Sequence, residues 1–360
     1  MVLVEQIYRL KEERVHGDLR KALKRKEITM DPAPYGTLKG RTTQELFALV
    51  SHFLSRYFHD RAKHCGPLRR NKNGAVPKMS DVEVLTVVLV GELKQLPSER
   101  AWYFELSTEY RHLCPNLLSR SRLVKRRIAL SSLLEAFRRK LLEYFGLDAS
   151  PHRFVDSKPV ILAHFSRASR NQNKRFRPRW LRDKHADLSV EVVPGFGHIG
   201  KCATKSETYF GMKLHMVCTF GAIPTCWCLT AANVDDRAPI CELLECEPRT
   251  HRGEGVELWC DNGYWEEDLE RRVVQLGHRV RSFPKKRDFG LWPRDLRKMI
   301  RSKRQKIETK FSEGKRFLGL ERPRAASLKG LMSEIGLKIT ALTFFALAPL
   351  FETMEWCLQH

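Results

Sequence analysis

Apolar residues recur every three or four positions through the first 148 residues of the chain, which is the spacing of amphipathic helices. Ser80 and Glu83 also form a capping-box pattern at the start of one apolar run. The predicted helices are Thr43–Phe58, Val82–Leu93, Glu99–Tyr110 and Ser121–Phe145. We therefore expect residues 41–148 to form an all-helical DNA-binding domain, preceded by a basic helical lead and linker over residues 1–40.

The pattern changes at Pro151, where short apolar runs begin to alternate with helical patterns. The predicted strands are Arg153–Val155, Tyr209–Thr219, Ala222–Leu229, Val256–Cys260 and Arg279–Phe283, with a hairpin turn at Phe220-Gly221. The predicted helices are Asp236–Glu245, Trp265–Leu276, Leu296–Phe317 and Leu328–Leu347. This order predicts an α/β domain with a mixed five-stranded sheet over residues 149–350. Its segment 165–200 is arginine-rich and is predicted to be a long loop.

Composition narrows the class of protein. Apolar residues make up 42% of the chain, which is typical of a globular protein. There are 65 Lys and Arg residues against 42 Asp and Glu residues, so the formal net charge of +23 favours binding to a polyanion such as DNA. The longest apolar stretch, Ile339–Phe351, contains Pro349 and is too short to span a bilayer. We expect it to be a buried helix, with no membrane among the partners.

Three acidic residues stand where a metal site is expected. Asp156 and Asp261 each follow an apolar strand, and open α/β sheets place their sites at such strand ends. Glu308 lies inside a predicted helix. Oxygen ligands suit Mg²⁺ or Mn²⁺, and two such ions promote phosphoryl transfer. Taken singly, each acid is better explained as a solvated surface residue or a helix cap. Their joint placement is what favours a metal site.

The helix around Glu308 carries cations on the same face. Arg304, Glu308, Phe311 and Lys315 are separated by four, three and four positions. A carboxylate on that face can hold a metal ion while the cations bind phosphates of DNA. An ordinary ion pair between Arg304 and Glu308 explains two of these residues equally well, but it leaves Lys315 without a role.

Other polar residues of this region have simpler interpretations. Either Asp235 or Asp236 is expected to cap the following helix rather than to bind a metal. His215 lies in an alternating strand, so we expect a structural histidine. Tyr264 and Trp265 follow Asp261 and fit two roles equally well, which are stacking on an extruded base and packing against the sheet.

Three basic clusters are candidate contacts with DNA. The first opens a predicted helix, the second lies in the arginine-rich loop, and the third, between residues 281 and 306, leads to Glu308. The residues singled out in the first two are Arg120, Arg122, Lys125 and Arg126, and Arg167, Arg170 and Arg175. Charged runs are usually solvated surfaces, but three of them around one group of carboxylates favour DNA binding.

Several motifs together resemble a known family. These are Phe154–Ser157, Gly200–His215, Leu229–Asp236, Asp261–Tyr264, Ile307–Phe311 and Glu321–Leu328, with Leu96–Tyr103, Tyr110–Leu113 and Ser119–Arg122 among the predicted helices. Residues 40–345 resemble bacterial insertion-sequence transposases of the DDE type. The resemblance is greatest to the nine-eight-two group, within the branch that carries a Tyr-Arg-Glu-Lys signature.

The resemblance implies an RNase H-like catalytic domain with acids on the first strand, the fourth strand and a later helix, which are the positions of Asp156, Asp261 and Glu308. The signature places its Arg, Glu and Lys on Arg304, Glu308 and Lys315. Its Tyr position holds Arg301 here, and Asn262 stands where many relatives have Lys. Both departures leave the metal-binding acids intact.

The same resemblance implies an activity and its partners. We expect two Mg²⁺ or Mn²⁺ ions, cleavage at the ends of an insertion sequence and transfer of the freed 3′-hydroxyl into target DNA. The expected partners are terminal inverted repeats, target DNA and a second copy of the chain in a homodimer on DNA, in the bacterial cytoplasm at the nucleoid. Two alternatives stay open, which are a nuclease of similar fold without strand transfer and a non-catalytic DNA-binding protein from a decayed element.

Overall fold

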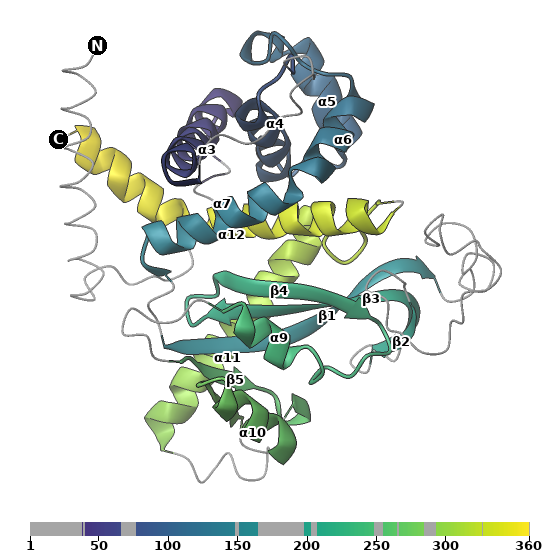
Figure 1. The fold of residues 1–360 in the computed structure, drawn as a ribbon, viewed down its shortest axis with the longest axis vertical. Coiled ribbons are helices and arrows are strands. Elements are labelled where there is room, and N and C mark those ends of the chain that lie inside the picture. The colour runs from purple at the N-terminus through teal and green to yellow at the C-terminus, as the bar shows by residue number, and fades with distance from the viewer. Residues whose placement is uncertain are drawn as a thin grey trace.

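The computed structural model describes residue 38 and residues 40–65, 77–147, 151–164, 198–202, 207–247, 255–264, 266–283, 293–325 and 327–359. In Figure 1 the N-terminal helices lie at the top, α7 and α12 cross the middle, and the sheet lies beneath them. The N-terminal lead, residues 1–37, and most of the arginine-rich loop lie outside the described residues.

Helices account for most of the N-terminal part, as predicted. They are α3 (Thr43–Cys65), α4 (Asp81–Leu93), α5 (Glu99–Thr108), the short 3₁₀ helix η1 (Arg111–Leu113), α6 (Arg120–Ala129) and α7 (Ser131–Tyr144). The predicted capping box is confirmed at α4, where Ser80 Oγ accepts a hydrogen bond from Glu83 N at 3.1 Å and the Glu83 carboxylate accepts one from Ser80 N at 2.6 Å. The single helix predicted over 121–145 is instead two helices, because Leu130 leaves helical geometry with φ −97° and ψ 5°.

The sheet is built around its longest strands. The strands are β1 (His152–His164), β2 (His198–Cys202), β3 (Glu207–Thr219), β4 (Pro224–Ala231), β5 (Glu257–Cys260) and β6 (Arg279–Ser282). β1 lies in the middle, antiparallel to β3 and parallel to β5, and β6 continues the parallel side. The sheet is therefore mixed, as predicted. The predicted hairpin at Phe220-Gly221 joins β3 to β4.

The prediction of five strands was wrong, because the described residues already form a sheet of six. The additional strand, β2, pairs with the first half of β3, and β4 pairs with the second half of the same edge. β2 and β4 therefore share one position at the edge of the sheet, next to β3. β2 reaches into the segment predicted as a loop, and its residues His198 and Ile199 are exposed, so it has no buried apolar alternation to detect.

Helices cover both faces of the sheet. On one face, α9 (Ile240–Glu245) and α10 (Glu267–Gln275) enclose a small core that includes Val155 and Val217. The other face joins the main core, which contains Phe154, Leu214 and Met216 together with residues of α3–α7, α11 (Arg294–Leu318) and α12 (Leu328–Gln359). The helical layer and the sheet consequently share one core.

The last helix, α12, is central to that shared core. It contacts α7, α4, α6, α11 and β4. By length and composition, residues Leu328–Phe351 would be able to cross a membrane, but 83% of their most apolar stretch is buried within the protein. Its side chains pack against both layers, so the predicted buried helix is confirmed, and it is longer than predicted because Pro349 lies inside it.

Gly211 allows β1 and β3 to approach closely, and this leads to a prediction. It pairs with Ile161 beside an irregularity in the β1–β3 register, and an added Cβ would lie 2.0 Å from the carbonyl oxygen of Val160. Because backbone cannot yield as a side chain can, we expect Gly211→Ala to lower the free energy of unfolding by about 1–3 kcal/mol in urea titrations. The matched control is Gly221→Ala in the hairpin, where the nearest atom is 3.5 Å away. Equal stability of the two variants would contradict the expectation.

Candidate active site

Strand register brings two of the three predicted acids together. Phe154 of β1 pairs in parallel with Trp259 of β5, and both side chains enter the main core. Side chains alternate between the faces of a sheet, so the residues two positions further along each strand, Asp156 and Asp261, project toward that same face. β5 ends at Cys260 whereas β1 continues to His164, so the two carboxylates lie where the sheet opens beside β1.

The third acid reaches the same opening from a helix. A cavity of about 720 Å³ is lined by Asp156, Asp261 and Glu308, the last contributed by α11. Helix α11 contacts β1, and Phe311 of α11 is buried in the main core beside Lys158, which places the Glu308 segment near the middle of β1. Besides the three acids, the lining includes the charged residues Asp236, Lys158, Lys201 and Lys213. Four carboxylates and three ammonium groups thus share one opening.

Asp156 is held by two neighbouring groups of its own strand. Its Oδ1 accepts a hydrogen bond from Ser157 N at 2.8 Å, and its Oδ2 lies 2.8 Å from the ammonium of Lys158. Burial raises the pKa of Asp156, and the charge of Asp261 adds to that increase, while Lys158 and the Ser157 hydrogen bond oppose it. The Lys158 ammonium also lies 5.4 Å from the centre of the Phe311 ring, so it joins the strand to α11.

Lys158 gives a second prediction. Because its ammonium favours the ionised form of Asp156, Lys158→Met is expected to raise the pKa of Asp156 further. The raised pKa means that a proton binds Asp156 more tightly in the folded protein than in the unfolded chain. Stability should therefore fall as the pH rises from the ordinary aspartate pKa through the raised value. Carboxyl carbon chemical shifts measured by NMR across pH test the direction. A pKa that stays the same or falls in Lys158→Met would contradict it, and Lys140→Met on α7 is the control.

The donor chemistry of the opening fits a divalent cation. Carboxylate oxygens are the preferred ligands of Mg²⁺ and Mn²⁺, and one of them is already stabilised by an ammonium group. In the conformation described, however, no three His, Cys, Asp or Glu side chains among the described residues come close enough to hold one ion. Asp156, Asp261 and Glu308 surround the cavity without meeting at one point. The Glu308 side chain is exposed.

The cations predicted on α11 have different surroundings. Lys315 is exposed and forms an ion pair with Glu321, which follows the helix. Arg301, at the departure from the signature, is also exposed. Arg304 lies within the helix, one turn before Glu308, but its side chain is outside the described residues. The Glu308 carbonyl oxygen accepts a hydrogen bond from Ser312 Oγ at 2.9 Å.

Asp236 is a cavity residue that the sequence did not single out for the site. The expected helix cap was wrong, because α9 begins after Pro239 without a side-chain cap, and Asp235 instead accepts a hydrogen bond from Arg237 N at 2.9 Å. Asp236 Oδ1 lies 3.0 Å from the ammonium of Lys213, which also donates to the carbonyl oxygen of Val234 at 2.7 Å. The available signal was Lys213, a charged residue between the apolar residues Met212 and Leu214 of β3.

Two other residues near the cavity have structural roles. His215 is fully buried, its Nε2 lies 2.8 Å from Thr230 Oγ1, and burial lowers its pKa to about 4, so the ring is neutral near pH 7. This agrees with the expected structural histidine. Tyr264 is buried in the small core beneath the sheet, which favours packing over base stacking, and burial raises the pKa of its hydroxyl group. Trp265 lies outside the described residues.

The remaining candidate DNA contacts divide into two groups. Arg120, Arg122 and Lys125 are exposed on α6. Arg126, in contrast, forms an ion pair with Asp81 and donates to the carbonyl oxygen of Met79 at 3.3 Å, so it joins α6 to the start of α4. Arg167, Arg170 and Arg175 lie outside the described residues.

Comparison with known proteins identifies the family. Residues 149–344 match the family model described as Transposase DDE domain. No curated protein matches the chain. Two solved structures are similar to it. One is a piggyBac transposase synaptic complex with hairpin DNA, at 11% identity and a TM-score of 0.36, covering 92% of this chain and 80% of that one. The other is a pre-cleavage Mos1 transpososome, at 12% identity and a TM-score of 0.21, covering 96% of each chain.

At these scores neither structural similarity supports a statement about activity. The family match is of a different kind, because it extends over more than half of the chain and contains the strands, the helix α11 and all three acids that line the cavity. This protein belongs to the Transposase DDE domain family.

Proposed function

We propose that the protein is a DNA transposase that cuts DNA at the ends of an insertion sequence and joins the freed 3′-hydroxyl to target DNA. The proposal rests on the placement of the three acids around one cavity. In a chain of the Transposase DDE domain family, Asp156, Asp261 and Glu308 approach from two adjacent strands and a helix and line the same cavity. They are the acids that the sequence predicts as catalytic, and the domain that holds them is proposed to be RNase H-like.

The proposed roles follow from the side chains. Asp156, Asp261 and Glu308 would hold divalent ions, Mg²⁺ or Mn²⁺, which when bound activate the attacking oxygen and stabilise the leaving oxygen. Lys158 neutralises Asp156 and limits the repulsion between Asp156 and Asp261. The Lys201 ammonium lies on the same cavity wall and supplies positive charge for a phosphate group.

The assembly that we propose also rests on charge. The net charge of +23 and the exposed Arg120, Arg122 and Lys125 of α6 support binding of DNA by the helical region, with the inverted repeats as its target. Two ends of one element must be brought together, so a homodimer on DNA is expected. The nine-eight-two group of insertion sequences is the group proposed for this chain.

A cleavage and strand-transfer assay tests the function. The substrate would be a duplex carrying the inverted repeat that flanks the coding region, incubated with purified protein, Mg²⁺ and a supercoiled target plasmid. Cleavage at the repeat followed by joined products is the expected result. Precut ends separate the two steps, because cleavage without joining would indicate a nuclease of similar fold. DNA binding with neither reaction would indicate a non-catalytic protein from a decayed element.

A further inference from the structure

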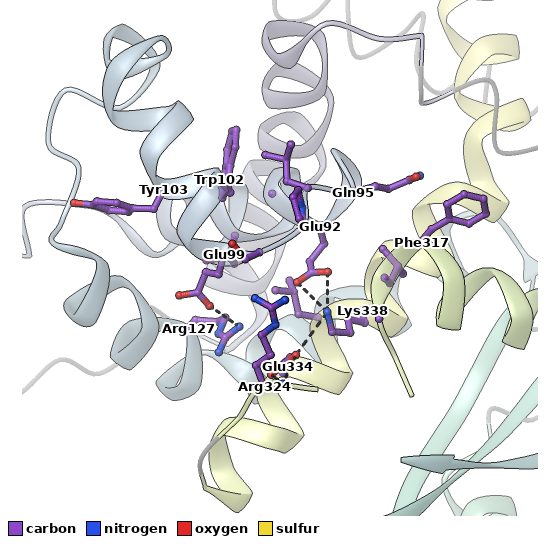
Figure 2. A pocket seen from close by; sticks show the side chains of 18 of the residues that line it. Glu92, Gln95, Glu99, Trp102, Tyr103, Arg127, Phe317, Arg324, Glu334 and Lys338 are labelled. Carbon is purple, nitrogen blue, oxygen red and sulfur yellow. Dashed lines mark hydrogen bonds and ion pairs between the residues drawn. The ribbon is translucent and has the colours of Figure 1, made fainter. Parts of the chain in front are cut away.

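A second cavity, of about 340 Å³, lies where the helical layer meets the C-terminal end of α11 (Figure 2). Its walls come from α4, α5 and α6 on one side, and from the end of α11, the turn that follows it and α12 on the other. It shares no lining residue with the cavity of the three carboxylates. The proposed cleavage chemistry therefore gives it no role.

Positive charge predominates in the walls of this cavity. Its charged residues are Arg127, Arg316, Arg322, Arg324 and Lys338 against Glu92, Glu99 and Glu334. Five cations thus face three carboxylates. A cavity with this balance favours an anionic occupant over a cationic or neutral one.

The carboxylates are already paired inside the wall. The Lys338 ammonium lies 3.2 Å from Glu92 Oε2 and 3.7 Å from Glu334 Oε1, and these contacts are drawn as dashed lines in Figure 2. Arg127 Nη1 lies 3.3 Å from Glu99 Oε2. Two cations therefore neutralise most of the negative charge, and the other guanidinium groups supply the excess.

Two of those guanidinium groups belong to the turn after α11. In the described part of the chain, neither Arg322 nor Arg324 forms an ion pair with a carboxylate through its side chain. Figure 2 shows the Arg324 side chain directed into the cavity, while its backbone N–H donates to the Glu334 carboxylate at 3.2 Å. That backbone contact holds the turn in place, so the guanidinium remains available to a ligand.

A buried donor points to the same kind of ligand. Arg127 is only 7% exposed, and its Nε makes no hydrogen bond to any described residue. The Nε2 of Gln95 is likewise buried without a partner among those residues, and so is one acceptor, Oε1 of Glu99. Buried polar groups are nearly always hydrogen-bonded in folded proteins. Figure 2 shows the Gln95 side chain directed away from Arg127 and Arg324, so Arg127 Nε is the donor that indicates an acceptor from outside the chain beside those guanidinium groups.

The cavity lies along the helix that carries Glu308. Arg316 is eight residues further along α11, which corresponds to about 12 Å of helix. A DNA strand rises about 3.4 Å per nucleotide, so this distance spans three to four nucleotides. Figure 1 shows α11 running from the sheet toward the helical layer, as such a path requires.

From these observations we infer that the second cavity binds a phosphate group of the DNA backbone, a few nucleotides away from the bond that is cut. The inference rests on the proposed function for the identity of the DNA. Guanidinium groups suit it chemically, since they donate in pairs to phosphate oxygens. Arg322 and Arg324 would supply the charge, and Arg127 Nε would donate a buried hydrogen bond.

Salt-dependent DNA binding tests the inference. The probe is a fluorescent 30-base-pair duplex of arbitrary sequence, titrated by anisotropy from low to moderate KCl without divalent ions. For Arg324→Gln and Arg322→Gln we expect binding about three- to tenfold weaker than wild type, and a slope of log K against log salt that is shallower by about 1 for each variant. Arg324→Lys keeps the positive charge, so its slope of log K against log salt should stay close to that of wild type. The control Arg271→Gln removes an exposed arginine of α10, outside both cavities, and should behave as wild type.

A second arm separates DNA from a free nucleotide. Binding of dAMP and of inorganic phosphate would be measured by calorimetry on the same proteins. Tight dAMP binding that Arg324→Gln removes, with an unchanged DNA slope, would overturn DNA as the source of the phosphate. Unchanged slopes together with no anion binding would overturn the site itself. Neither arm requires cleavage, so an inactive protein would contradict the proposed function without affecting this result.

Discussion

Asp156→Ala is expected to abolish DNA cleavage while leaving DNA binding within about twofold of wild type. The residue lies at the opening beside β1, next to Asp261 and across from Glu308. Loss of a catalytic metal ligand removes several kcal/mol of transition-state stabilisation, and about 4 kcal/mol corresponds to roughly a thousandfold lower rate. Single-turnover cleavage of the inverted-repeat duplex in Mg²⁺ measures the rate, and anisotropy measures binding.

The matched control is Asp268→Asn on α10, an aspartate whose side chain is 58% exposed and, among the described residues, pairs with two arginines of its own helix. It should cut DNA at the wild-type rate. Asp156→Asn, which keeps the shape of the side chain, should fail as completely as Asp156→Ala, because the negative charge is what matters. Cleavage by Asp156→Ala at more than a tenth of the wild-type rate would remove Asp156 from the proposed catalytic acids.

Arg153→Met is expected to have the largest effect on stability. The Arg153 and Glu247 side chains are both fully buried and form an ion pair, and Glu247 Oε2 also accepts a hydrogen bond from Thr225 Oγ1 at 2.7 Å. Removing the arginine leaves a buried carboxylate without its cation, which typically costs about 3–5 kcal/mol of folding free energy. Urea unfolding followed by circular dichroism measures the change.

Two variants distinguish a lost ion pair from a general disturbance. Lys140→Met breaks an exposed pair with Glu143 on α7, whose side chains are 51% and 58% exposed, and should change stability by less than about 1 kcal/mol. The double variant Arg153→Met with Glu247→Leu removes both charges together. Its free energy of unfolding should therefore be closer to the wild-type value than that of Arg153→Met alone. If the double variant is as unstable as Arg153→Met alone, the cost would come from packing rather than from the unpaired charge.

The elements that carry the three acids could be predicted from the sequence, because short apolar runs and helical spacing are local patterns. Asp156 and Asp261 each follow a short apolar strand, and strands that pair in parallel place their ends at the same edge. Glu308 was assigned to a helix from the spacing of the residues around it. What the sequence did not contain is the pairing of β1 with β5, which arises from contacts about a hundred residues apart along the chain.

The features that sequence reasoning missed depend on tertiary packing. β2 is exposed, so it carries no alternation of buried and polar residues to reveal it. β1 was predicted too short because Lys158 and Pro159 interrupt its apolar run, yet both remain in the strand. Either Asp235 or Asp236 was expected to cap a helix, because that role needs only local sequence. The contact of Asp236 with Lys213 joins two separate segments, and only the folded chain shows it.

The position of α12 has a consequence for the synthesis of the protein. This helix is made after every other described element, yet its side chains occupy the middle of the core that the helical layer and the sheet share. Until residues 328–351 emerge from the ribosome, the apolar surfaces of α4, α7 and β4 that it covers stay open to other molecules. The shared core therefore cannot be completed before this helix has been made. A copy of the gene interrupted shortly before this helix would yield an aggregation-prone fragment instead of a shorter transposase.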